Sequence, residues 1–231
     1  MKLSTALLAT AAALFTVVGG ANAAVIDLNF EGINATYPST NYAEILNFYN
    51  GGTSNQGTSG TNYGISFPSN ALAICLNTPG NACSNTSRGG LGDPNSQKGA
   101  LFFLSGATTF LDDPAGFTKG FSFNYVAINE GGSVNVYSGP DGTGTLLATL
   151  DLPTTPSGCS DIYSAAFCPF VAAGVSFAGT AQSIGFSGVA NQIVFDDVTF
   201  GSATPGVPEP TTLAILGAGL VGLGVARRKF R

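Results

Sequence analysis

The 231-residue sequence contains no histidine and no tryptophan, and charged residues make up only 9% of it. Without histidine, neither a Ser-His-Asp triad nor a histidine metal site can form. The G-x-S-x-G nucleophile elbow is also missing. Carboxylates such as Glu31, Glu44 and Glu130 could still hydrolyse a glycoside, but their spacing singles out no pair. We therefore expect a protein that is not an enzyme, and keep a carboxylate-dependent polysaccharide hydrolase as the alternative.

Basic residues are scarce in the body of the chain. Residues 24–206 contain three basic side chains against twelve acidic ones, whereas Arg227, Arg228, Lys229 and Arg231 make the end of the sequence basic. An acidic body without a basic stripe argues against nucleic acid as a partner. The low charge and the abundance of Gly, Ser, Thr and Asn are typical of an extracellular β-protein.

Residues 1–23 have the three parts of a signal peptide. Lys2 provides a positive start, residues 6–18 form an apolar run, and Ala21, Asn22 and Ala23 form a small-x-small cleavage site. The alternative is an N-terminal core helix, which would not need these parts in this order. We expect cleavage after Ala23 and export of the mature chain.

The four cysteines suit an oxidising compartment. They fall as two close pairs, which predicts the local disulfides Cys75–Cys83 and Cys159–Cys168. Four cysteines allow three pairings, so the connectivity stays open. Zinc is the rival interpretation, but the chain has no histidine and no C-x-x-C motif.

The sequence from 24 to 201 shows short apolar or alternating runs separated by Gly, Pro, Asn and Asp, with almost no helical periodicity. This pattern predicts an all-β, antiparallel β-sandwich domain of jelly-roll type. The expected strands are 25–30, 64–67, 71–76, 100–104, 117–128, 133–137, 145–152, 174–177, 183–186 and 192–200. The turn sequences at 130–133 and 139–142 predict that residues 117–152 form a three-stranded meander.

Two features of the body could contact a ligand. The glycine-rich stretch 50–64 is interpreted first as a long flexible loop and second as a ligand-contacting loop. Six tyrosines could stack on sugar rings, although tyrosine in a β-protein is more often half-buried packing. These tyrosines are Tyr42, Tyr49, Tyr63, Tyr125, Tyr137 and Tyr163.

Carboxylates end the first and the last expected strand. Glu31 follows the first strand, and Asp196 and Asp197 lie in the last one. In a jelly roll these strands often lie close together, and carboxylates among apolar residues are costly unless they are paired or bind a cation. The arrangement resembles the structural calcium site of many β-sandwich carbohydrate-binding modules, which implies Ca²⁺ as a structural cofactor held by these three residues. The alternative is that one aspartate simply faces solvent.

The sequence ends in an uncharged segment, residues 212–226, followed by the basic cluster. Gly217, Gly219 and Gly222 match the spacing of a dinucleotide-binding fingerprint, but no βαβ unit and no acidic residue follow them. A membrane segment fits better. Its 15 residues would span roughly 22 Å as a helix, so thinning of the bilayer or flanking residues would have to compensate.

Residues 202–207 form a short linker to this segment, and Pro208, Glu209 and Pro210 precede it directly. The Pro-Glu-Pro motif, the glycine-rich segment and the arginine-rich end together resemble the PEP-CTERM sorting signal of Gram-negative bacteria. The resemblance covers residues 208–231 and implies recognition by an exosortase, transient anchoring in the inner membrane, and delivery to the cell surface or beyond. It also implies an association with exopolysaccharide and biofilm. We therefore expect an exported matrix component or glycan binder, with a pure structural scaffold as another alternative.

Overall fold

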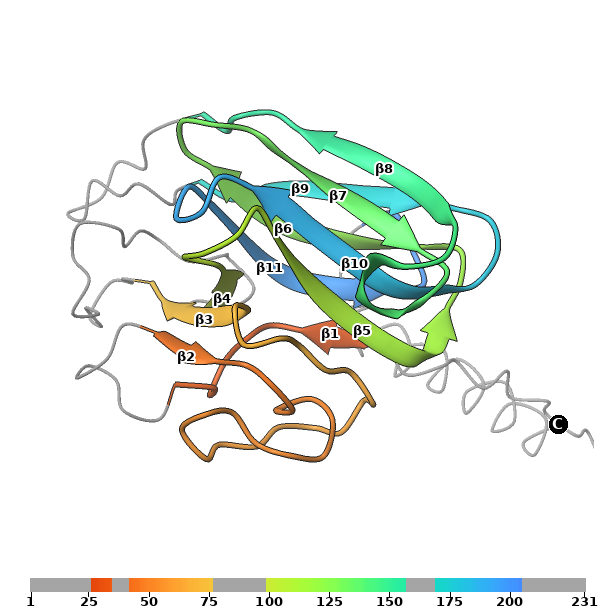
Figure 1. The fold of residues 1–231 in the computed structure, drawn as a ribbon. Helices are drawn as coiled ribbons and strands as arrows, with labels where there is room; N and C mark the ends of the chain where they lie inside the picture. Colours follow the sequence, from red (N-terminus) through yellow and green to blue (C-terminus); the bar gives the residue numbers. More distant parts are fainter. Residues whose placement is uncertain (1–25, 35–41, 77–98, 157–168, 205–231) are drawn as a thin grey trace, which may run out of the picture.

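The computed structural model describes residues 26–34, 42–76, 99–156 and 169–204. These residues form two antiparallel β-sheets, so the all-β prediction is confirmed (Figure 1). The expected signal peptide, the sorting signal at 208–231 and half of the linker lie outside the described residues. Within the described ranges, no helix is long and apolar enough to cross a membrane.

The larger sheet has seven strands in the order β2-β3-β4-β11-β6-β9, and β1 also pairs with β11. Both β1 and β4 pair with β11, at Leu28 with Val198 and at Leu101 with Phe195. The predicted closeness of the first and last strands is therefore confirmed. The strands are β1 (Asp27–Leu28), β2 (Tyr42–Glu44), β3 (Leu72–Cys75), β4 (Gly99–Phe102), β6 (Gly120–Ala127), β9 (Val171–Ser176) and β11 (Ile193–Phe200).

The smaller sheet has four strands in the order β5-β10-β7-β8. Its strands are β5 (Thr108–Phe117), β7 (Gly132–Tyr137), β8 (Leu146–Leu152) and β10 (Ala181–Gly188). The turn between β7 and β8 contains the short 3₁₀ helix η1 (Pro140–Gly142), in which Asp141 has a positive φ of 50°. The hairpin predicted at residues 139–142 is therefore confirmed.

The main core lies between the two sheets. Phe121, Phe123 and Tyr125 of β6 alternate along the strand and meet Phe186 of β10, whose ring centroid is 6.2 Å from that of Phe123. Full burial of each such side chain contributes roughly 1.5–3 kcal/mol. The other face of the larger sheet holds a second buried cluster, which includes Phe102. Both faces of β6 are therefore buried.

The meander prediction is wrong in one pairing. β7 and β8 form the expected hairpin, but β6 belongs to the larger sheet, between β11 and β9. The turn at 130–131 thus carries the chain from one sheet to the other. The reason is burial on both faces: all eight residues of β6 are buried, as suits a central strand rather than one strand of an exposed meander.

Candidate functional site

The predicted carboxylate site lies where β11 changes its neighbour from β4 to β1. The register between β11 and β6 shifts between Asp196 and Thr199, and Asp197 within this bulge has a φ of 49°. The Asp196 Oδ1 atom accepts a hydrogen bond from the Asp197 backbone N–H at 2.8 Å. Asn124 of β6 donates from Nδ2 to Asp197 Oδ2 at 3.3 Å. The bulge thus brings two buried aspartates and an amide together.

Glu31 reaches the same region from the turn after β1. Its Oε1 atom accepts a hydrogen bond from the backbone N–H of Gly99, at the start of β4, at 2.9 Å. Gly99 has no room for a side chain, because a Cβ atom there would collide with the carbonyl group of Phe30. The close approach of these two backbones is what places Glu31 beside β4.

The donor set of this region is of the hard oxygen type that calcium prefers. In the described part of the chain, however, no three Asp, Glu, His or Cys side chains form a group that could hold a metal ion by themselves. A bound ion would therefore need carbonyl or water oxygens as further ligands. The calcium site of Glu31, Asp196 and Asp197 stays a prediction.

A groove of about 330 Å³ opens next to Glu31. One wall comes from β1 and the turn that follows it, and the other comes from the segment after β2. The lining residues are Asp27, Asn29, Glu31, Phe48, Tyr49, Gly60, Thr61 and Tyr63. The groove thus combines two carboxylates and an amide on one side with tyrosine rings and a hydroxyl on the other.

The glycine-rich stretch 50–64 follows a defined, hydrogen-bonded path. The hydroxyl groups of Ser54 and Thr58 are 2.7 Å apart, and Thr58 Oγ1 donates to the Ile33 carbonyl at 2.6 Å. The Tyr63 backbone N–H donates to the Tyr49 carbonyl at 2.8 Å. These bonds fasten the loop to the body, so its last residues form a wall of the groove rather than part of a loose connection.

Tyr49 is a buried residue in the lining of the groove. Its ring stacks against that of Tyr63, with centroids 6.3 Å apart and planes at 27°. Its hydroxyl accepts a hydrogen bond from the Phe30 backbone N–H at 2.9 Å. Burial raises the pKa of Tyr49 far above its ordinary value, and the nearby charges of Asp196 and Asp27 raise it further. Tyr49 is therefore a neutral, fixed side chain, whereas half-buried Tyr63 presents its ring to the groove.

Several predicted residues are not brought into this site. Glu44 lies in β2 and Glu130 lies in the exposed connection between β6 and β7, so neither joins Glu31 in the groove. Cys75 is disulfide-bonded, but Cys83, Cys159 and Cys168 lie outside the described residues, so neither predicted pairing is tested. Pro208, Glu209, Pro210 and the basic residues Arg227, Arg228, Lys229 and Arg231 also lie outside them.

Sequence reasoning did not predict the groove residues Asp27, Asn29 and Thr61. These residues are exposed and of common types, and nothing in their spacing marks them. One feature of the sequence did point to the groove. It was the glycine-rich stretch 50–64, interpreted as a ligand-contacting loop, which includes Thr61 and Tyr63.

Comparison with known proteins identifies the end of the chain. The PEP-CTERM protein-sorting motif family matches residues 206–229. A comparison with curated protein sequences finds no match.

Two of the solved structures similar to this chain are complexes with cello-oligosaccharides. One is a carbohydrate-binding module of Cellvibrio mixtus lichenase 5A in complex with cellotriose, with 12% identity, 58% of this chain and 88% of that chain covered, and a TM-score of 0.32. Another is an arabinoxylan arabinofuranohydrolase from Bacillus subtilis, with 18% identity, coverage of 56% and 24%, and a TM-score of 0.32.

The K3 adhesin domain of Lys-gingipain from Porphyromonas gingivalis is also similar in structure. It shares 15% identity with this chain, with 77% of this chain and 98% of that chain covered, and a TM-score of 0.34.

Proposed function

We propose that this exported protein, which carries the PEP-CTERM protein-sorting motif at residues 206–229, is a non-enzymatic glycan-binding component of the cell surface or the exopolysaccharide matrix. An exosortase would process it at or near Pro208, Glu209 and Pro210, after transient anchoring through residues 212–226. The groove between β1 and the glycine-rich loop would hold the glycan.

The lining of the groove carries this proposal. Carboxylate and amide groups of Asp27, Asn29 and Glu31 can hydrogen-bond sugar hydroxyls, with the charged acceptors forming the stronger bonds. The Tyr63 ring can pack against the apolar face of a sugar, and the exposed Thr61 can add a hydroxyl contact. Most of the lining is polar, which suits a ligand that carries many hydroxyl groups.

The groove also favours one alternative. Asp27 and Glu31 are two carboxylates that line the same groove, and most glycoside hydrolases act through a pair of carboxylates. The hydrolase alternative therefore now concerns this pair, and not Glu44 or Glu130.

Binding of the full chain to the exopolysaccharide of its host tests the proposal. Tyr63→Ala removes the groove ring and should weaken binding at least tenfold, about 1.4 kcal/mol. Tyr42→Ala is the matched control, because Tyr42 is 44% exposed on β2 and lies outside the groove. Equal binding by the two variants, or no saturable binding by the unaltered chain, would contradict the proposal and favour a pure scaffold.

The same samples separate the binder from the hydrolase. Reducing ends are measured after incubation of the full chain with the polysaccharide. A binder releases none. Release that is lost in Asp27→Asn, with unchanged melting temperature, would show that the groove is a catalytic site.

We also propose that a calcium ion stabilises the region of Glu31, Asp196 and Asp197. The support is that Asp196 and Asp197 lie buried in the bulge of β11 beside Asn124, and that Glu31 lies beside the start of β4, which pairs with β11. The ion would hold β1 and β4 on β11 and need not contact the glycan.

A further inference from the structure

One side of the groove is built by the alternation of residues 27–31. Leu28 and Phe30 belong to the core. The residues that alternate with them are the exposed Asp27 and Asn29 and the half-buried Glu31. Successive residues of an extended chain point to opposite sides, so these three polar side chains share the side that faces away from the core. All three line the groove and make this side acidic.

The other side of the groove is aromatic. A Cβ atom at Gly60 would collide with the Phe48 ring, so the backbone of the glycine-rich loop lies directly on that ring. The rings of Phe48 and Tyr49 meet edge to face with centroids 4.8 Å apart, and both are buried. The Tyr63 ring is the most exposed of the three. It is therefore the aromatic surface that a ligand in the groove can reach.

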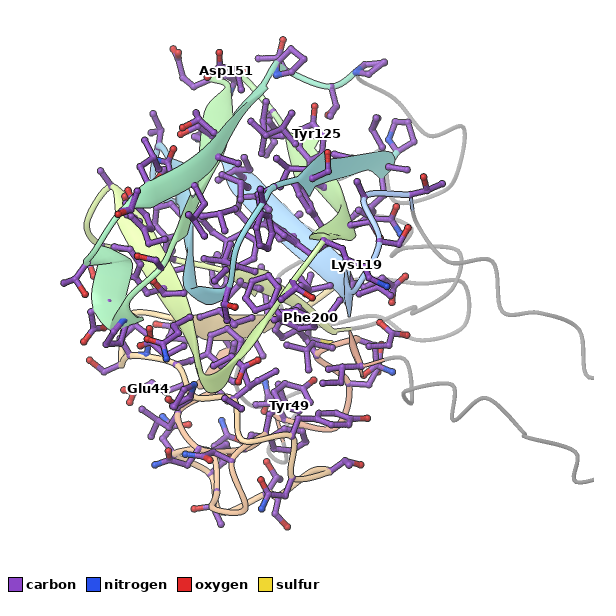
Figure 2. All side chains as sticks on the ribbon, turned by 90° about the vertical axis from the view of Figure 1, so that its right-hand side faces the viewer. Glu44, Tyr49, Lys119, Tyr125, Asp151 and Phe200 are labelled. Carbon is purple, nitrogen blue, oxygen red and sulfur yellow. The ribbon has the colours of Figure 1, made fainter. Side chains whose placement is uncertain are left out.

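The electrostatic potential in the groove is negative. Burial raises the pKa of Tyr49, and the nearby charges of Asp196 and Asp27 raise it further. A potential that holds the proton on a tyrosine also attracts a cation. Within the described ranges, Lys119 is the one basic residue, and it lies in the connection between β5 and β6. Figure 2 shows Lys119 well apart from Tyr49, with Phe200 between them in the view.

An ammonium group matches both sides of the groove. Its N–H groups can donate charge-assisted hydrogen bonds to a carboxylate, which are stronger than bonds between neutral groups. A cation above the face of a tyrosine ring is also attracted by that ring. A sugar acid would be repelled by Asp27 and Glu31, and a neutral sugar would use them only as hydrogen-bond acceptors. The lining thus favours a cationic ligand over an anionic or a neutral one.

The size of the groove suits one sugar unit better than a folded partner. Its volume of about 330 Å³ lies at the low end of the range of about 300–1,000 Å³ for small-ligand pockets. Asn29 and Thr61 are exposed residues of the lining. Their amide and hydroxyl groups can both donate and accept hydrogen bonds, as the hydroxyls of a sugar require.

We propose that the groove binds a glycan that carries free amino groups, and that the Asp27 carboxylate and the Tyr63 ring hold its ammonium groups. This inference rests on the proposed glycan-binding function and adds the chemical class of the glycan. Glu31 contributes negative charge, while its Oε1 atom stays bonded to the Gly99 backbone N–H. The exposed Asp27 is the direct partner of the amine.

Titration of the full chain in mild detergent with two oligosaccharides of the same backbone tests the class of glycan. The β-1,4-linked hexasaccharide of glucosamine carries an amine on every sugar, whereas that of N-acetylglucosamine carries uncharged amides. The glucosamine form should bind at least tenfold more tightly, a difference of about 1.4 kcal/mol. Equal binding of the two forms, or no binding of the glucosamine form, would overturn this inference. Binding of the host exopolysaccharide by the same sample then shows whether the proposed glycan-binding function fails as well.

Two aspartate variants test the position of the amine. Asp27→Asn should remove most of the preference for the glucosamine form without changing the melting temperature. Asp151→Asn is the matched control, because it removes the same charge at an exposed position of β8. Figure 2 shows Asp151 at the top of the view and Tyr49 near the bottom. Equal weakening by both variants would mean that the overall acidity of the protein attracts the polycation, and would overturn the proposal.

A peptide of six lysines separates a glycan site from a site for basic peptides. It carries several ammonium groups but no sugar ring or sugar hydroxyls. The unaltered chain should bind it at least tenfold more weakly than the glucosamine hexasaccharide. Equally tight binding of the peptide that is also lost in Asp27→Asn would overturn the proposal and identify a peptide as the ligand.

Discussion

At the scale of single residues, Asp112 is the carboxylate whose environment is best defined. It lies on β5, and its Oδ1 atom accepts a hydrogen bond from the Asp141 backbone N–H at 2.7 Å. Burial raises the pKa of Asp112, and the neighbouring charge of Asp141 raises it further, whereas this backbone hydrogen bond lowers it. The result is a folded-state pKa above the ordinary value.

The raised pKa of Asp112 determines how the stability of the fold changes with pH. A raised folded-state pKa means that the folded protein binds the proton more tightly than the unfolded chain does. The contribution to stability is therefore complete at a pH below the unfolded pKa of about 3.9 and is lost as the pH rises through the folded pKa. At neutral pH the Asp112 charge destabilises the fold.

We predict that Asp112→Asn raises the melting temperature at pH 7. The amide oxygen can still accept the Asp141 hydrogen bond, and the half-buried charge is gone. Melting curves of both proteins between pH 3 and pH 8 check this. The advantage of the variant should shrink as the pH falls, and a constant difference across the range would show that charge is not the cause.

Gly99 is the second residue with a defined steric limit. An added methyl group would collide with the Phe30 backbone, and such overpacking typically costs about 1–3 kcal/mol. Gly99→Ala should therefore lower the free energy of unfolding by about 2 kcal/mol in denaturant titrations. Gly32→Ala is the control, because Gly32 has a φ of 74° but open space around it, and should cost only about 1 kcal/mol of backbone strain. If Gly32→Ala lowered the free energy of unfolding as much as Gly99→Ala or more, the collision at Gly99 would be contradicted.

At the scale of elements, the stability of the β11 bulge provides a test of the calcium proposal. If an ion holds Glu31, Asp196 and Asp197, its removal leaves carboxylates that repel one another and loosen β1 and β4 from β11. We predict that EDTA lowers the melting temperature at pH 7 and that added Ca²⁺ restores it, whereas Mg²⁺ does so poorly because it prefers a rigid octahedral site. An unchanged melting temperature in the presence of chelator would show that the calcium proposal is wrong.

The strands show how far the pattern of the sequence determines the fold. β7, β8 and β11 were predicted within a residue or two, because alternation and flanking turn residues mark them clearly. β5 was missed, because Asp112, Asp113, Pro114 and Gly116 have the composition of a turn. Pro114 is tolerated because β5 is an edge strand, and the register between β5 and β10 shifts nearby.

The candidate sites were only partly predictable for a related reason. Glu31, Asp196 and Asp197 could be grouped from sequence, since they flank the first and last strands, and these strands do pair. The groove depends on how residues 50–64 fold back onto β1. This arrangement is not encoded in local periodicity, because it results from contacts between distant segments.

At the scale of the whole molecule, we expect the body and the sorting motif to have separate tasks. The described body carries an acidic groove lined by tyrosines. If this groove binds glycan, the body alone supplies the binding. The PEP-CTERM motif at residues 206–229 would then serve only to bring that body outside the cell.

The sorting role can be separated from simple membrane anchoring. Proline disfavours helix and favours extended backbone, which suits a protease cleft, and Pro208 and Pro210 stand in the sequence directly before the uncharged residues 212–226. We predict that Pro208→Ala with Pro210→Ala leaves the protein uncleaved and in the inner membrane fraction, while deletion of residues 208–231 leaves it soluble but mis-sorted. Intact mass of the protein from each cell fraction checks both outcomes. Surface delivery of the double variant with the same mass as the unaltered protein would show that the prolines are not what the sorting enzyme recognises.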